Sequence, residues 1–375
     1  MTVYLDNAAT TPVDPVVIDA MWPVMQHEFG NPSSIHQFGR KTRNLIEQSR
    51  RTIARLLDVA PSEIFFTSGG TEADNMILRQ CVPSLGVQHI ITALTEHHAV
   101  EHTAKVMEEQ GQVQLHWVQT DAKGNVDLNH LESLLKKHSK VLVSLMHANN
   151  EIGTLLPLTE VGQLCETYNA LFHSDTVQTM GHYALTPKKD KVHFMTCAAH
   201  KFHGPKGVGF LYMDSQHKIT PFIHGGSQER QMRGGTENVS GIVGLAKALE
   251  LCYSEMKLHQ EHIYHLKSYF ISQVQQQIPG TEFNGETSFE KALYTVLNCL
   301  FPGHPDAEML LYNLDIKGIA ASGGSACSSG SNQGSHVLRA LGVDMQRPSV
   351  RFSFSKFNTK EEIDYTLNIL KSIYK

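Results

Sequence analysis

Several features are missing from this sequence of 375 residues, and each absence excludes a class of protein. No stretch approaches the roughly 18 uncharged apolar residues that a membrane-spanning helix needs. The six cysteines lack C-x-x-C spacing, which argues against a disulfide framework and a classical zinc site. No basic block offsets the net charge of -5, so we expect no nucleic acid ligand. The N-terminus has neither the basic flank nor the apolar core of a signal peptide, and we expect a cytoplasmic protein.

What is present suits a large globular chain with two or three cooperating units, since 41% of the residues are hydrophobic and 18% are charged. Short apolar runs alternate with helical patterns over the first two-thirds, which predicts an α/β fold with helices on the faces of a sheet. The expected strands are Glu63–Thr67, His89–Leu94, Gln114–Val118, Val141–Met146, Ala170–Ser174, His193–Cys197 and Gly207–Met213. The expected helices are Arg40–Leu57, Thr71–Cys81, Ala99–Glu109, Leu128–His138, with Asp127 as its N-cap, and Leu158–Tyr168.

A different pattern begins near Asn238. Apolar residues keep helical spacing from there until Pro279, which predicts one long helix that bridges two domains, with a boundary near residues 255–260. The remainder reads as a smaller α+β unit. Its expected strands are Thr295–Cys299 and Ser349–Phe354, and its expected helices are Asp306–Asp315 and Lys360–Ile373.

A glycine-containing turn joins an apolar strand to a helix within residues 63–75. Gly69 and Gly70 let the backbone approach a ligand closely, and the helix N-terminus attracts an anion, to which the Ser68 and Thr71 hydroxyls can add donors. A phosphate fits this turn, although an ordinary capped strand-helix turn explains it equally well. Neither of the common glycine-rich nucleotide motifs is present in the segment.

Two charged residues follow other predicted strands. Asp175 lies at the carboxyl end of one, where open α/β sheets gather their ligands, although an aspartate there is more often a cap or turn residue. Lys201 lies at the end of another, where partial desolvation favours the unprotonated amine that attacks carbonyl carbons. Lys206 fits a solvated turn better. A phosphate cradle, an aspartate and a lysine together match the needs of pyridoxal phosphate.

The residues that carry this chemistry also carry a family resemblance. The chain resembles the cysteine desulfurases of the class V aminotransferase group nearly from end to end, through Tyr4-Leu-Asp-Asn-Ala-Ala-Thr-Thr-Pro12, Asn31-Pro-Ser-Ser-Ile-His36 and Ser68-Gly-Gly-Thr-Glu72. The resemblance implies the fold-type-I aminotransferase architecture, with a mainly parallel sheet covered by helices on both faces and a smaller α+β domain. We accordingly expect a large cofactor-binding domain over residues 14–257 and a small domain over residues 1–13 and 258–375.

The resemblance also implies roles at matching positions. Lys201 would form the Schiff base with pyridoxal phosphate, His97 would stack on its ring, and Asp175 would bind the pyridine nitrogen. The full set of implied cofactor-binding residues is Gly70, Thr71, His97, Asn150, Asp175, Gln178, His200, Lys201 and Thr236. Thr236 would reach the phosphate of a partner subunit, which implies a homodimer with shared sites. One departure is Ala198, where the family commonly has a hydroxyl that contacts the phosphate.

The segment from Ala321 to Ser335 is rich in glycine and serine and surrounds Cys327. A thiol on a loop with so few apolar residues should be exposed and able to reach both a substrate and a partner. By resemblance, Cys327, Lys201 and His97 are the catalytic residues, and Arg351 binds the substrate carboxylate together with Asn150. Without the resemblance, Arg351 could equally be a structural ion-pair partner.

The implied activity is a pyridoxal-phosphate-dependent cysteine desulfurase, a sulfurtransferase that converts L-cysteine to L-alanine and a persulfide on Cys327. The sulfur would pass to an acceptor for iron-sulfur cluster assembly or thiolation, and Cys327 is a candidate ligand of a cluster shared with a scaffold protein. The alternatives are a selenocysteine lyase, a sulfinate-releasing class V enzyme and, in another class, a catalytically silent sulfur carrier or scaffold-docking protein. The chain ends at Lys375 without the C-terminal tail common among scaffold-feeding desulfurases, so we expect weak scaffold binding.

The 22 histidines include two spacings that could in principle hold a metal. They are His98 with His102, and His259 with His262 and His265. Because no acidic residue or cysteine other than Glu101 and Glu261 stands at ligand spacing, we expect no intrinsic metal site at either place, and the second group reads as a solvated helix face.

Overall fold

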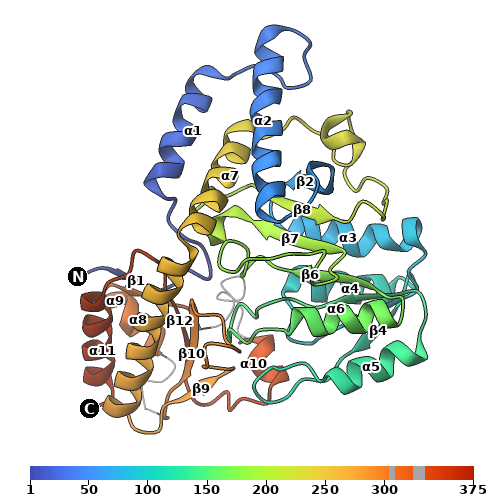
Figure 1. Ribbon diagram of the computed structural model, residues 1–375. Helices are drawn as coiled ribbons and strands as arrows, with labels where there is room; N and C mark the ends of the chain where they lie inside the picture. The colour runs from blue at the N-terminus through green and yellow to red at the C-terminus, as the bar shows by residue number, and fades with distance from the viewer. Residues whose placement is uncertain (304–308, 324–333) are drawn as a thin grey trace.

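A computed structural model describes residues 1–303, 309–323 and 334–375. Figure 1 shows a broad sheet flanked by helices, a smaller unit that contains both chain termini, and a protrusion formed by α1 and part of α2. The predicted α/β class and fold-type-I architecture are confirmed. No helix in the described part of the chain is both long and apolar enough to cross a membrane.

The large sheet contains seven strands in the order β2-β8-β7-β6-β5-β3-β4. Their bounds are β2 Ile64–Thr67, β3 His89–Thr92, β4 Gln114–Trp117, β5 Val141–Ser144, β6 Leu171–Asp175, β7 Phe194–Ala198 and β8 Gly209–Met213. β8 runs antiparallel to both of its neighbours, β2 and β7, and the other six strands share one direction. Each of the seven expected strands is present, and no end differs from the expected one by more than two residues.

Helices cover both faces of this sheet. Their bounds are α1 Pro15–His27, α2 Gln37–Leu56, α3 Gly70–Leu85, α4 His98–Glu109, α5 Leu128–Lys137, α6 Leu158–Thr167 and α7 Val239–Ser254. Side chains of α3 and α4 share one core with Ile90 and Leu142, whereas α2, α5, α6 and α7 share another with Ile91 and Val143. The alternation of neighbouring strand residues between two cores explains why the strands are apolar on both faces. Asp127 caps α5 as expected, accepting the backbone N–H groups of Asn129 and His130.

The prediction of one long helix after Asn238 is wrong, because α7 ends at Ser254 and a separate α8 spans Met256–Gln277. Glu255 between them has non-helical backbone angles, with φ -112° and ψ 10°. The apolar residues of α7 pack against the large sheet, whereas those of α8 pack in the core of the smaller unit. Helical spacing continues through the break because both helices bury a face, so periodicity alone could not reveal it. The predicted domain boundary at residue 257 stays a prediction.

The smaller unit is built around an antiparallel sheet in the order β12-β10-β9. The bounds are β9 Glu282–Asn284, β10 Val296–Leu300, β12 Ser349–Ser353, α9 Leu310–Ile316, α10 His336–Ala340 and α11 Lys360–Ile373. A parallel pair of β1 (Val3–Tyr4) and β11 (Ile319–Ala320) joins the chain start to it. The expected helix 306–315 corresponds to α9, and residues 306–308 lie outside the described part. Sequence patterns missed the short elements β1, β9, β11 and α10. They also missed α1, although Asp14 as N-cap and Pro15 as first residue mark the beginning of that helix.

Candidate active site

A cavity of about 210 Å³ lies at the carboxyl ends of β6 and β7. Most of the residues expected at the site line it, although they come from segments far apart in the sequence. These lining residues are Gly70, Thr71, His97, Asn150, Asp175, Gln178, His200, Lys201 and Arg351. Sequence reasoning did not assign a role to Ala8, Ala9, Asp74, Met146 and Val177, which also line the cavity.

Two buried carboxyl groups lie on one side of the cavity. Asp175 ends β6, and its Oδ1 accepts the backbone N–H of Val177 at 2.9 Å. Burial and the neighbouring Asp74 carboxyl raise the pKa of Asp175 to about 7. Burial also raises the pKa of Asp74 to about 7, although its Oδ1 accepts the Thr196 hydroxyl. A positively charged ligand group beside Asp175 would therefore stabilise the ionised carboxylate.

Lys201 ends a short 3₁₀ turn that follows β7. Its Nζ donates to the backbone carbonyls of Ala8 at 2.6 Å and Ala9 at 2.9 Å. Gln178 Nε2 also donates to Ala8 O, at 3.1 Å. The N-terminal segment thus orients the amine within the cavity. The only sequence feature that points to this role is the Tyr4–Pro12 motif. Ala8 and Ala9 contact Lys201 through backbone carbonyls, so their side chains do not reveal the contact.

Two cavity histidines are electrically neutral near pH 7. Burial, followed by the positive charge of Lys201, lowers the pKa of His97 to about 4. The same two causes lower the pKa of His200 to about 4. His97 caps α4 by accepting the Ala99 N–H at its Nδ1, a bond that fixes the ring orientation. A neutral ring of this kind can face a flat ligand without adding a positive charge.

The start of α3 forms a close approach to the cavity. A Cβ atom placed on Gly70 would lie 2.6 Å from Val177 Cγ2, so only glycine leaves the backbone room there. The helix N-terminus and the Thr71 hydroxyl provide the donors expected for a phosphate. Ala198 lines the same cavity and presents a methyl group, so this position adds no hydroxyl donor beside the turn.

Arg351 lies on β12 and is only 1% exposed. Its Nη1 donates to Asn150 O at 2.8 Å, and its Nη2 donates to Asp6 Oδ1 at 2.8 Å. Among the described residues, nothing accepts a hydrogen bond from Nε. A buried guanidinium that is held from two sides at the cavity wall is suited to bind a carboxylate. Asp6 is a second contribution of the N-terminal segment that sequence reasoning missed.

One predicted cofactor-binding residue is not in this cavity. Thr236 is exposed and lines a separate hollow with Ser68, Gly207 and Arg233, so it does not reach the cavity within one chain. Cys327 lies outside the described residues. All five cysteines that the structure describes are buried, and burial raises the pKa of each thiol.

The two histidine groups considered from the sequence differ in three dimensions. His98, Glu101 and His102 come within ligand distance of one another, but Lys105 forms an ion pair with the Glu101 carboxylate. On α8, His259 contacts Glu255. His262 instead bonds to Asn358 O at 2.9 Å, so these neighbours on one helix have separate partners.

The aminotransferase class-V family model matches residues 3–366. The chain belongs to the class V aminotransferase family. It is 44% identical to the cysteine desulfurase IscS of Dictyoglomus turgidum over 375 residues, which cover 99% of this chain and 94% of that protein. A solved NifS-like protein matches with a TM-score of 0.91 and 38% identity, covering 100% of this chain and 99% of the other. SspA, solved in complex with cysteine, matches with a TM-score of 0.81 and 29% identity over 96% of this chain and 100% of the other.

Proposed function

We propose that this protein is a pyridoxal-phosphate-dependent cysteine desulfurase that releases L-alanine from L-cysteine and retains the sulfur as a persulfide on Cys327. The observation that carries the proposal is the convergence of Lys201, Asp175, Gly70 and Arg351 on one cavity. The identity to curated cysteine desulfurases over nearly the whole chain supports the choice of substrate.

The residues present fit the cofactor. Gly70 and Thr71 at the N-terminus of α3 would hold the phosphate, Asp175 the pyridine nitrogen, and the neutral His97 ring one face. When bound, pyridoxal phosphate withdraws electrons from the substrate α-carbon and so stabilises the negative charge left by proton removal. The raised pKa of Asp175 supports this fit, because burial disfavours the ionised carboxylate and a protonated pyridine beside it would offset that cost.

Substrate binding would use Arg351 and Asn150, which also line the cavity. Arg351 would bind the carboxylate of L-cysteine, held in place by Asp6 and the Asn150 carbonyl. The Asn150 side chain lines the same cavity and would donate to the substrate. Because Arg351 is buried and held by both neighbours, it would lose little conformational entropy on binding.

Proton transfer would use Lys201. Its Nζ lines the cavity and, once unprotonated, would take the α-proton of the substrate. The Ala8 and Ala9 carbonyls would keep the amine directed into the site. His97, neutral near pH 7, could relay a proton at its Nε2, because Nδ1 accepts the Ala99 N–H.

Sulfur transfer would use Cys327, whose role rests on the sequence. Its thiolate would attack the sulfur of the substrate, forming a sulfur-sulfur bond as the carbon-sulfur bond breaks. The electron pair of the broken bond would stay on the substrate carbon, which takes a proton and leaves as L-alanine. The persulfide would then pass to a sulfur-acceptor or iron-sulfur scaffold protein.

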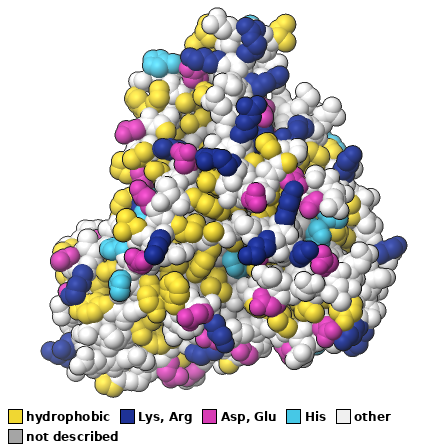
Figure 2. Space-filling model, viewed as in Figure 1, with side chains coloured by type: hydrophobic (Ala, Val, Ile, Leu, Met, Phe, Trp, Pro, Cys, Tyr) yellow, Lys and Arg dark blue, Asp and Glu magenta, His cyan; other side chains and the backbone are white. Residues whose placement is uncertain are grey.

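Shared active sites in a homodimer form part of the proposal. Thr236 is exposed in a glycine-containing loop outside its own cavity, where it could reach that of a second copy. Exposed apolar side chains on and just after α1, including Trp22, Met25 and Phe29, offer a surface that a second copy could bury. Figure 2 shows hydrophobic side chains along this protrusion.

Quantification of alanine and sulfide from L-cysteine, with dithiothreitol present, tests the activity. We expect turnover by the wild-type protein, none by Lys201→Ala, and normal turnover by Lys206→Ala, which alters an exposed lysine outside the cavity. Cys327→Ala should bind the cofactor yet form almost no alanine. Full activity of Cys327→Ala would favour a selenocysteine lyase or sulfinate-releasing enzyme, and failure of the wild-type protein to bind the cofactor would favour a silent carrier.

A further inference from the structure

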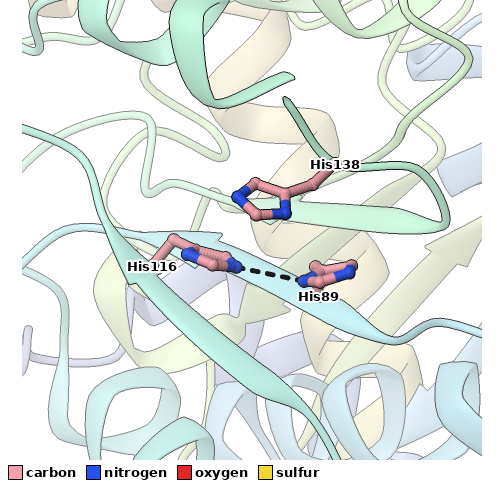
Figure 3. A group of neighbouring side chains, drawn as sticks. All are labelled: His89, His116 and His138. Atoms are coloured by element: carbon pink, nitrogen blue, oxygen red, sulfur yellow. Dashed lines mark hydrogen bonds between the residues drawn. The ribbon is translucent and has the colours of Figure 1, made fainter. Parts of the chain in front are cut away.

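Three histidines from different elements meet at the end of the large sheet opposite the cavity. His89 begins β3, His116 lies within β4, and His138 directly follows α5 (Figure 3). His89 pairs with Val141, the first residue of β5, and His138 precedes that strand, so both lie at the amino ends of the parallel strands, while His116 is the third residue of β4. The cavity lies at the carboxyl ends, beside Asp175, and is therefore a separate site.

The three side chains point toward one another. His89 Nδ1 and His116 Nε2 are 3.1 Å apart, and one ring nitrogen of each histidine lies within 4.8 Å of the other two. The ring centroids of His116 and His138 are 4.1 Å apart, and those of His89 and His138 are 4.5 Å apart. Figure 3 shows the His138 ring above the His89–His116 pair.

This spacing is close to what a metal ion requires. Two imidazole nitrogens bound to tetrahedral zinc, each about 2.05 Å from the ion, lie about 3.3 Å apart. The His89–His116 pair already has nearly this separation. The remaining nitrogen distances could shorten by side-chain rotation, because all three residues are only partly buried.

The charge state also suits a metal ligand. Burial and the neighbouring histidines lower the pKa of both His89 and His116, which favours the neutral ring that a metal ion binds. In a pair of neutral rings only one nitrogen of the close contact carries a proton. A metal ion would bind both nitrogens at once after this proton moves to the other nitrogen of its ring, so that both histidines bind as neutral imidazoles.

We propose that His89, His116 and His138 form a binding site for a divalent transition-metal ion such as zinc, with a fourth position open to water or another small ligand. The bound ion would connect the end of α5 to β3 and to the edge strand β4. It would therefore stabilise the folded protein without entering the proposed desulfurase reaction.

Zinc titration of the cofactor-loaded protein by calorimetry, with chelator competition, tests this site. His89→Asn, His116→Asn and His138→Asn should each lose one zinc equivalent, with the affinity of that equivalent reduced roughly 100-fold or more. His265→Asn, which alters an exposed histidine on α8, is the matched control and should bind the full number. His116→Cys retains a zinc ligand and should retain the equivalent.

Thermal unfolding provides the second measurement. Zinc should raise the Tm of the wild-type protein and of His265→Asn but not of the three single-site variants. Circular dichroism and cofactor absorbance should match the wild-type protein in every variant, since the site is remote from the cavity. An unchanged zinc stoichiometry and affinity in all three histidine variants would overturn the proposal, as would zinc binding too weak to compete with a mild chelator.

Discussion

At the residue scale, the least conventional feature is a pair of carboxyl groups in a buried cavity wall. Asp74 and Asp175 are 1% and 5% exposed, and Asp74 Oδ2 has no hydrogen-bond partner among the residues that the structure describes. Each pKa is raised to about 7, mainly by burial. The two groups therefore destabilise the cofactor-free protein whenever both are ionised.

Asp74→Asn should stabilise the cofactor-free protein increasingly as pH rises from about 4 to about 7. Well below pH 4 the Asp74 carboxyl is protonated in both the folded and the unfolded state. As pH rises above about 3.9, this carboxyl ionises first in the unfolded state. The wild-type protein therefore loses stability until pH exceeds the pKa of Asp74 in the folded state. We expect a gain of about 4 kcal/mol at pH 7, because each of the roughly three units between the two pKa values contributes about 1.4 kcal/mol, and urea denaturation at several pH values measures it. Asp58→Asn, at an exposed site, should show no such trend. A gain that is constant or falls with pH would contradict the assignment.

Arg351→Lys should raise the KM for L-cysteine roughly 10–100-fold while changing kcat less, because an ammonium group cannot replace a guanidinium that binds a carboxylate at two points. Steady-state alanine formation measures both constants. Arg347→Lys is the control, since Arg347 donates to Phe301 O and does not line the cavity. An equal effect of the two substitutions would mean that Arg351 acts through the fold alone.

The residues with recognisable chemistry were identifiable because each belongs to a local motif. Lys201, Asp175 and Gly70 stand at strand or helix ends, where sequence patterns are informative. Asp74 and Asp6 could not be identified from the sequence, because their significance depends on residues distant in the chain. Asp74 acts on Asp175, and Asp6 accepts a hydrogen bond from Arg351. No spacing rule connects such pairs.

At the scale of elements, a buried ion pair fastens the loop that carries Thr236. Arg50 on α2 donates to both carboxylate oxygens of Glu229, at 2.9 and 2.7 Å, and the Phe66 N–H on β2 donates to the same carboxylate. The side chains of Arg50 and Glu229 are 3% and 2% exposed. The contact joins a helix, a sheet strand and the loop at one point.

Glu229→Ala should lower the free energy of unfolding by about 3–5 kcal/mol, because it leaves the Arg50 guanidinium buried without its main partner. Glu47→Ala removes the other carboxylate that contacts Arg50, but Glu47 is 41% exposed and its loss should cost less than about 1 kcal/mol. Urea denaturation of both variants provides the comparison. Similar losses would show that exposure does not govern the strength of these two contacts.

At the scale of the whole molecule, the proposed homodimer has a complementation test. Mixed dimers of Lys201→Ala and Thr236→Ala chains would contain one site with both residues intact if Thr236 acts across the interface. At limiting cofactor we therefore expect up to half of the wild-type activity from mixed dimers and little from either parent. Co-expression with two affinity tags isolates the mixed species. If Thr236 acts within its own chain, the mixed dimer will gain nothing over its parents.

The control for this experiment is a measurement of dimer formation. Sedimentation should show dimers for the wild-type protein and for both parent variants, because neither residue lies on the apolar side of α1. Trp22→Glu, in contrast, places a charge among the exposed apolar residues of that helix and should favour monomers. A monomeric wild-type protein would contradict the proposed shared sites.

The sequence by itself determined the alternation of strands and helices, together with Gly70, Asp175 and Lys201, because these depend on short-range patterns of burial, turns and strand ends. The family resemblance implied most of the other residues expected at the cavity. Only the tertiary structure decided the break at Glu255, the Asp74–Asp175 pair and the grouping of His89, His116 and His138. Each of these depends on which strands are neighbours and which core a helix faces. The sheet order places β3 between β4 and β5, and long-range burial, rather than any local spacing, establishes that order.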